Sequence, residues 1–185
     1  MSQKSYRLKR AETGLLVIDI QERLLPQIFE KERLIQESVR LIKGATILGI
    51  PIFVTEQYRK GLGLTAPEIA SAISGFSPIE KETFSACGAE GLVTAIQSRG
   101  IRDVLLCGME AHICVLNTCL DLLGNGFSVF VVADAVSARK PENARLAFER
   151  MRDAGAVIVS TEMVLFELLG RARTEEFKQV QALVK

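Results

Sequence analysis

The sequence predicts an α/β protein with a three-layer αβα architecture around a six-stranded parallel sheet. Short runs of Val, Ile and Leu alternate with longer segments in which apolar residues recur at helical spacing, an order typical of βαβ units. Four of the predicted strands are nearly continuous apolar runs, as expected for strands that helices cover on both faces. The length of 185 residues suits one domain, and no repeat or linker divides the chain, so we expect a single domain over residues 1–185.

The predicted strands are β-branched and aliphatic runs bounded by turn residues. The third strand is the exception, because it is polar and carries Lys81 between Glu80 and Glu82. Side chains alternate between the two faces of a strand, so Lys81 should point away from both glutamates. The predicted strands span residues 14–20, 51–55, 78–82, 103–107, 128–133 and 156–160.

Five helices are predicted between and after these strands. Gly49 followed by Pro51 ends the first helix, and Pro141 fits the first turn of the fourth. The helices span residues 30–48, 90–98, 114–123, 141–154 and 161–169. Two segments, 56–76 and 84–88, fall outside this scheme, and the longer one, which contains several Gly and Pro residues, is predicted to be a mobile connection. Long connections at strand ends are where α/β proteins bind ligands.

The charge of the chain is nearly balanced, with 23 Lys and Arg against 22 Asp and Glu and a net charge of +1. Such a chain has no strong field to attract nucleic acid or anionic lipid, so we expect a small-molecule substrate and no nucleic-acid or membrane partner. A hydrophobic content of 48% is high for a soluble monomer and favours a homo-oligomer. The start MSQKSYRLKR lacks the apolar core of a signal peptide, and no apolar run approaches the roughly 20 residues of a membrane span, which indicates a cytoplasmic protein.

Several common kinds of site are not predicted. The four cysteines form no C-x-x-C pair, and with a single histidine they make no evident zinc site, so we expect no metal and no cofactor. The sequence has no G-x-G-x-x-G after the first strand, no Walker-type phosphate loop and no G-x-S-x-G elbow. Free thiols fit a reducing compartment.

Two charged residues fall at the carboxyl ends of predicted strands. Asp19 follows an apolar run, where an unpaired carboxylate is costly to bury, and Lys81 lies near the end of the third strand. The strands of a parallel sheet end at one edge, so the ammonium of Lys81 could meet the carboxylate of Asp19 there. Each residue also has a plain structural interpretation, Asp19 as an anchor of the next loop and Lys81 as a solvated lysine.

Cys114 is the cysteine whose setting best suits chemistry. It is predicted at the start of an apolar helix, where partial positive charge and free N–H groups shift a thiol toward thiolate and can bind an oxyanion. Cys107 and Cys119 are interpreted as small core residues. His112 lies two residues before Cys114, a spacing at which helical residues do not face each other, so we favour a pocket-lining or surface role for it over that of a catalytic base.

Six segments carry a resemblance to a known family: LLVIDIQERL, PIFVTEQY, IEKETFSAC, VLLCGMEAHICVLNT, VFVVADAVSARKPEN and AGAVIVSTEM. Together they resemble the isochorismatase-like hydrolases, a cysteine hydrolase superfamily that includes nicotinamidases and carbamoyl-amidases. The resemblance covers nearly the whole chain, and its three central motifs fall in order on Asp19, Lys81 and Cys114. It implies a Rossmann-like six-stranded parallel sheet with a catalytic triad at its carboxyl edge.

The resemblance also implies a role for each of these residues. Cys114 is the nucleophile, Asp19 takes its proton and later activates water, and Lys81 holds the thiolate and the carboxylate in place. A non-proline cis peptide bond is implied between Met109 and Glu110. It would aim the N–H groups of Glu110 and Cys114 at one point, which would form an oxyanion hole.

Departures from the family pattern limit the choice of substrate. Nicotinamidases carry metal ligands after the second strand, where this sequence has Glu56-Gln57-Tyr58 and no histidine, so a metal-assisted nicotinamidase is not expected. True isochorismatases cleave a vinyl ether and need no nucleophilic cysteine, so Cys114 points away from that reaction. The residues that we place in the substrate pocket are Gln21, Glu56, Tyr58, Phe84, Cys87 and His112.

The leading hypothesis is a hydrolase that cleaves a small amide, imide or related C–N bond through a thioester intermediate. A second hypothesis is a catalytically weak pocket or scaffold protein of the same fold. A third, ranked last, treats Cys114 as a redox-active thiol with Cys87 as its resolving partner, although no C-x-x-C motif supports it.

Overall fold

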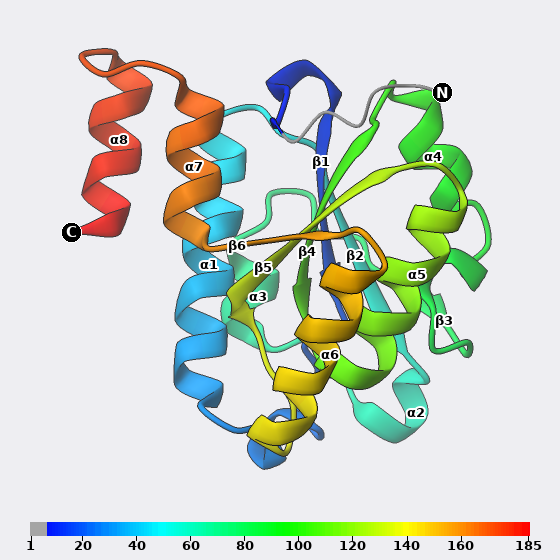
Figure 1. Cartoon of the computed structure of the whole chain (residues 1–185). Coiled ribbons are helices and arrows are strands. Elements are labelled where there is room, and N and C mark those ends of the chain that lie inside the picture. Colours follow the sequence, from blue (N-terminus) through cyan, green and yellow to red (C-terminus); the bar gives the residue numbers. More distant parts are fainter. Residues whose placement is uncertain (1–6) are drawn as a thin grey trace.

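The strands form one six-stranded sheet in which all neighbours are parallel, in the order β3-β2-β1-β4-β5-β6 (Figure 1). The structure is a computed structural model that describes residues 7–185; the first six residues of the basic start of the chain lie outside the described residues. The predicted α/β fold with a parallel sheet is confirmed. The strands are β1 (Thr13–Ile18), β2 (Ile52–Gln57), β3 (Ile79–Lys81), β4 (Asp103–Gly108), β5 (Ser128–Val136) and β6 (Val157–Val159).

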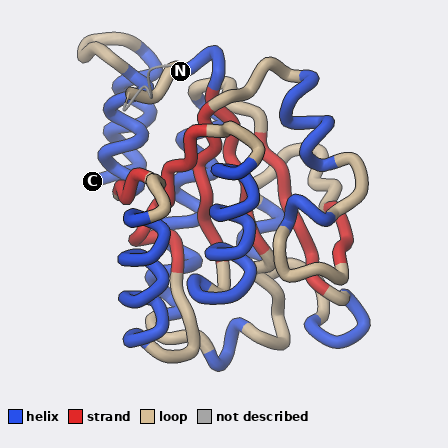
Figure 2. The backbone as a smooth tube through the Cα atoms, turned by 45° about the vertical axis from the view of Figure 1, so that its right-hand side comes forward, coloured by secondary structure: helices blue, strands red, loops and turns tan. Residues whose placement is uncertain are grey.

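Helices cover both faces of this sheet and make the two outer layers (Figure 2). The α-helices are α1 (Lys31–Ile47), α2 (Arg59–Leu62), α3 (Pro67–Ser71), α4 (Leu92–Ser98), α5 (Leu116–Gly124), α6 (Pro141–Asp153), α7 (Thr161–Leu169) and α8 (Glu175–Val184). Shorter turns of helix are η1 (Arg10–Glu12), η2 (Leu25–Gln27), η3 (Ala86–Gly88) and the π-helical η4 (Ala111–Val115). None of the helices in the described part of the chain is both long and apolar enough to cross a membrane.

The alternation of side chains along β1 divides the core into two clusters. Leu15 and Val17 pack on one face with α1, α3, α7 and α8, whereas Leu16 and Ile18 pack on the other face with α4, α5 and α6. All four of these side chains are fully buried. An apolar run without polar alternation is therefore what a central strand between two helical layers requires.

The connections depart from the sequence prediction in three places. The segment 56–76, predicted as a mobile loop, carries the end of β2 and the two short helices α2 and α3. The C-terminal helix α8 was not predicted; it is capped by the side chain of Thr174, which accepts a hydrogen bond from the N–H of Phe177, and it buries only Val180 completely. The helix predicted to start at Cys114 is preceded by η4, so helical structure begins three residues earlier.

Gly108 fixes how the ends of β1 and β4 meet. Its φ of +123° is open only to glycine without strain, and a Cβ atom there would lie 2.1 Å from the carbonyl oxygen of Ile18. The next residue, Met109, donates its N–H to the same carbonyl at 3.0 Å. The chain that leaves β4 is thereby held against the end of β1, where Asp19 follows.

Candidate active site

Asp19 occupies the first position after β1, at the carboxyl edge of the sheet. Its φ of +51° turns the chain out of the strand, a conformation that Asp tolerates better than most residues. Thr55 of β2 holds it in two ways: the Asp19 N–H donates to the Thr55 carbonyl at 3.2 Å, and the Thr55 hydroxyl donates to Asp19 Oδ1 at 2.7 Å. The carboxylate is 1% exposed and therefore depends on these partners and on a charged one.

That charged partner is Lys81, the last residue of β3. Its Nζ lies 2.7 Å from Asp19 Oδ2 and 2.7 Å from Gln57 Oε1, and it also donates to the carbonyl oxygens of Thr83 and Phe84 at 3.1 Å. The lysine side chain is fully buried, so the alternative of a solvated lysine is wrong for this chain. The structure brings Asp19 and Lys81 together from strands that are two positions apart in the sheet.

Cys114 comes to the same point from η4, on the far side of β1. Its thiol lies near enough to Asp19 and Lys81 for both side chains to shift its pKa. Burial and then the charge of Asp19 raise the pKa of Cys114 to about 12, and the ammonium of Lys81 lowers it by less. The expected shift toward thiolate is therefore wrong for the free protein. The sulfur carries a proton, and the carboxylate of Asp19 lies within reach of it.

The loop between β4 and η4 is built as the resemblance implied, with a cis peptide bond between Met109 and Glu110. The carboxylate of Glu110 is buried and turned toward Arg139, whose backbone N–H and Nε donate to it at 2.9 and 3.0 Å. The N–H of Ala111 donates to the Ser137 carbonyl at 2.8 Å, which joins the loop to the end of β5. Assignment of the Glu110 and Cys114 N–H groups to an oxyanion hole stays a prediction.

Comparison with known proteins agrees with this geometry. The sequence profile of the isochorismatase domain matches residues 13–163, which include every strand and all three residues of the Asp19–Lys81–Cys114 cluster. The chain belongs to the isochorismatase family. It is 40% identical over 180 residues to human isochorismatase domain-containing protein 2, an alignment that covers 97% of this chain and 86% of the human protein.

Solved structures share the fold over nearly the full chain. A structure described as MAR1 ribonuclease from Caenorhabditis elegans superimposes with a TM-score of 0.89 and 40% identity, and covers 96% of this chain and 92% of its own. The Escherichia coli YcaC gene product, described as an octameric hydrolase of unknown specificity, gives a TM-score of 0.91 at 23% identity, with coverage of 98% and 92%. At that identity the second comparison shows the fold alone.

Two of the residues predicted to line the pocket of this isochorismatase-family chain, Gln21 and Glu56, hold neighbouring segments of its backbone together. Gln21 is fully buried, and its amide bonds the backbone N–H and carbonyl of Gln57 at 2.7 and 3.0 Å. Glu56 is also buried, with one carboxylate oxygen bonded to the backbone and hydroxyl of Thr65 and the other to Arg59. Both side chains have their polar atoms committed to neighbouring segments, so neither offers a free group to a substrate.

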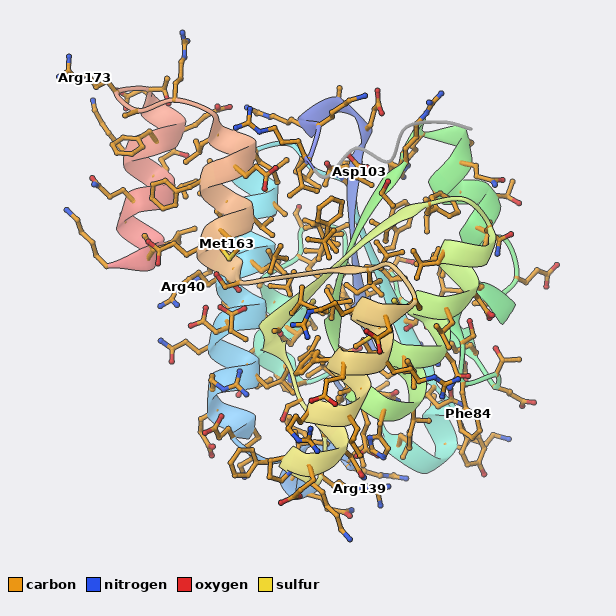
Figure 3. All side chains as sticks on the ribbon, in the orientation of Figure 1. Arg40, Phe84, Asp103, Arg139, Met163 and Arg173 are labelled. Atoms are coloured by element: carbon orange, nitrogen blue, oxygen red, sulfur yellow. The ribbon has the colours of Figure 1, made fainter. Side chains whose placement is uncertain are left out.

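Tyr58 and Phe84 are placed differently, because they are exposed by 53% and 61%. Tyr58 directly follows β2, and Phe84 comes three residues after the end of β3; both strands end beside the cluster. Figure 3 shows Phe84 at the same lower end of the molecule as Arg139, opposite Asp103 at the start of β4. Two exposed aromatic residues beside a buried polar centre are suited to contact a ligand.

His112 and Cys87 do not contact the sulfur of Cys114. His112 Nε2 lies 3.2 Å from Asn143 Nδ2 on α6, and Nδ1 has no hydrogen-bond partner. Neither ring nitrogen can therefore take the proton of Cys114 in this conformation. Cys87 is half-buried in η3, and burial raises its pKa. All four cysteines are free thiols, and no group of three or more His, Cys, Asp or Glu in residues 7–185 is arranged to hold a metal ion.

Sequence reasoning missed two residues that support the cluster. Gln57 contacts Lys81 directly, as described above. Thr118 on α5 is fully buried, and its hydroxyl donates to the Cys114 carbonyl at 2.6 Å and accepts from the Ala86 N–H at 2.8 Å. Thr118 is a neutral polar residue within an otherwise apolar helix, and this is the signal that could have identified it, whereas Gln57 follows Thr55 and Glu56 in a polar run and has no such signal.

Proposed function

We propose that this isochorismatase-family chain is a cysteine hydrolase that cleaves a C–N bond of a small amide or imide. The observation that carries the proposal is the buried ion pair of Asp19 and Lys81, whose carboxylate and ammonium both act on the pKa of one buried thiol, Cys114. Nucleophilic catalysis by cysteine needs a base to take the proton and a cation to stabilise the resulting thiolate. Asp19 and Lys81 are in place for these two tasks.

The proposed reaction has two stages. As the Cys114 sulfur attacks the substrate carbonyl carbon, its proton passes to Asp19, and the oxyanion is held by N–H groups of the loop 109–114. The C–N bond then breaks while Asp19 returns the proton to the leaving nitrogen, which leaves a thioester. A water molecule next gives a proton to Asp19 and attacks the thioester carbon; the C–S bond breaks, and the sulfur regains its proton. The buried centre holds one cation, Lys81, and one negative charge throughout, first on Asp19 and then on the oxyanion.

The alternative is a weak catalyst or a scaffold protein, and the high pKa of Cys114 favours it in one respect, because such a protein would also have a buried protonated thiol. Measurement of turnover distinguishes the hydrolase from this alternative. A panel of small amides, imides and carbamoyl compounds, with RNA included because of the name given to the C. elegans structure, should reveal a substrate among the small molecules. No turnover on any of them would favour the scaffold.

Substitution tests the nucleophile directly. Cys114→Ala should abolish hydrolysis without loss of folding, whereas Cys119→Ala, which removes a thiol from the buried core, should retain it. Turnover by Cys114→Ala at the rate of the unsubstituted protein would refute the proposal. Cleavage of RNA alone, dependent on Cys114, would keep the nucleophile and refute the substrate class.

We further propose a homo-oligomer that works in the cytoplasm. Exposed apolar side chains on α6 and α7 support the first part. Free thiols at all four cysteines support a reducing compartment. Light scattering on the purified protein should give a mass that is a multiple of 20.3 kDa.

A further inference from the structure

Both polar atoms of the Gln57 side chain, and both its backbone N–H and its backbone carbonyl, are hydrogen-bonded. In register it sits beside Lys81, since Gln57 at the end of β2 pairs with Lys81 at the end of β3. Its Oε1 accepts from Lys81 Nζ at 2.7 Å, and its Nε2 donates to the Glu82 carbonyl at 2.7 Å. Because one end must accept and the other must donate, the amide has one orientation that satisfies both contacts.

The backbone of Gln57 is clamped by Gln21, which follows β1. With the contacts described above, the two glutamines, Lys81 and Asp19 form a ring across the ends of β1, β2 and β3, in which three links are hydrogen bonds and the fourth is the backbone between Asp19 and Gln21. Gln21 and Asp19, which close the ring, are two residues apart in the chain. The position of the Lys81 ammonium is therefore determined from several directions.

The charges in this ring are matched one to one. Of the four oxygen acceptors around Lys81 Nζ, only Asp19 is charged; Gln57 and the carbonyls of Thr83 and Phe84 are neutral. When the proton of Cys114 moves to Asp19, the negative charge moves from carboxylate to sulfur, and the buried centre still holds one cation and one anion. A second anion at position 57 would compete with the thiolate for the ammonium and disfavour its formation.

We infer that Gln57 is a positioning residue that holds Lys81 in place and, by being neutral, leaves its charge for Cys114. This inference rests on the proposed function of the site. It predicts that Gln57→Glu, which is nearly isosteric, slows thiolate formation at neutral pH. Once protonated, the carboxyl group that this substitution introduces can again accept from Lys81 through its carbonyl oxygen and donate to the Glu82 carbonyl through its hydroxyl. Acid pH should therefore restore the behaviour of the unsubstituted site.

The experiment measures alkylation of Cys114 by iodoacetamide across pH, in a Cys87→Ser background that removes the half-buried thiol of Cys87. Relative to the parent, Gln57→Glu should react about tenfold more slowly at neutral pH, and the difference should disappear as the pH falls. Gln57→Met is the matched control: it has similar length and no ionisable group, so its rate relative to the parent should not vary with pH. A Gln57→Glu profile that parallels that of Gln57→Met would overturn the inference.

Folding and the proposed function can be separated from this result. If Gln57→Glu does not fold at neutral pH, its urea midpoint relative to the parent should recover at acid pH, and a deficit independent of pH would refute the inference. Alkylation needs no substrate, so it reports on Gln57 even if Cys114→Ala proves active and the hydrolase proposal fails. Conversely, parallel profiles with an inactive Cys114→Ala would remove the role of Gln57 and leave the hydrolase proposal intact.

Discussion

Replacement of Asp19 by Asn should make Cys114 more acidic while it removes catalysis. The carboxylate contacts the thiol and, after burial, is the largest cause of its high pKa. A neighbouring negative charge disfavours the thiolate, so its removal lowers the pKa of Cys114 from about 12, and Lys81 is then free to pair with the sulfur. Asn keeps the size of Asp19 and an oxygen for the Thr55 hydroxyl, so the change is mainly one of charge.

The size of the shift in the pKa of Cys114 follows from the loss of one unit charge beside the thiol. A unit charge within hydrogen-bonding reach shifts a pKa by about 1 to 3 units, so the thiolate fraction at neutral pH should rise about tenfold to a thousandfold. Hydrolysis should fall by about a hundredfold or more, because the group proposed to take and return the proton is lost. The two effects have opposite signs, which a general disruption of the site would not produce.

The assay combines alkylation rates, ultraviolet absorbance of the thiolate and turnover, all across pH and in the Cys87→Ser background. Urea denaturation of Asp19→Asn controls for folding, because the buried Lys81 loses its charged partner. An alkylation profile that stays in place or moves to higher pH would refute the electrostatic account of Cys114. Full turnover by Asp19→Asn would refute its role as the base.

Three further predictions concern stability. Arg139→Ala leaves the buried carboxylate of Glu110 with one backbone donor and should lower the free energy of unfolding by about 1 to 3 kcal/mol. Urea denaturation measures this change. An unchanged urea midpoint would mean that the Arg139 side chain contributes nothing to stability through Glu110. Gly108→Ala should cost more than about 2 kcal/mol, because its Cβ would meet the Ile18 carbonyl and its φ is strained for alanine; thermal unfolding close to that of the parent would contradict this packing. Burial raises the pKa of Asp103, so the folded state binds a proton more tightly than the unfolded state, and stability falls as the pH rises through that window. Asp103→Asn should therefore raise the free energy of unfolding at neutral pH, and this increase should shrink as the pH is lowered through the range in which carboxyl groups titrate. An increase that does not depend on pH would contradict the raised pKa of Asp103.

The strands of the parallel sheet could be predicted because the apolar pattern of each strand lies within a few consecutive residues. Leu15 to Ile18 read as a strand buried on both faces, and they are. The end of a parallel strand also predicts where its polar residues go, which is why Asp19 and Lys81 could be assigned to one edge before their contact was known. The helices α2, α3 and α8 were harder, because two are only four and five residues long and the third buries little.

The acidity of Cys114 could not be predicted in the same way. From the sequence, the predicted helix start indicated a lowered thiol pKa, but that effect competes with burial and with the charge of the Asp19 carboxylate. The balance depends on how completely the loop 109–114 and β1 exclude water from the sulfur, which is a property of the packed structure. Gln57 escaped notice for a related reason: its importance comes from register with Lys81, and register is set by tertiary pairing.

The same charge balance constrains the substrate. The ammonium of Lys81 is matched by Asp19 and by neutral acceptors, so a carboxylate at the reacting end of a ligand would put a second anion beside a single buried cation. A neutral carbonyl adds no charge until sulfur attacks, and the charge it then develops replaces the one that left Asp19 when that residue took the proton. The exposed aromatic side chains of Tyr58 and Phe84 beside the cluster carry no charge either. Amides and imides meet both conditions, and for this reason we propose them, rather than anionic esters or carboxylate-adjacent bonds, as the substrate class of Cys114.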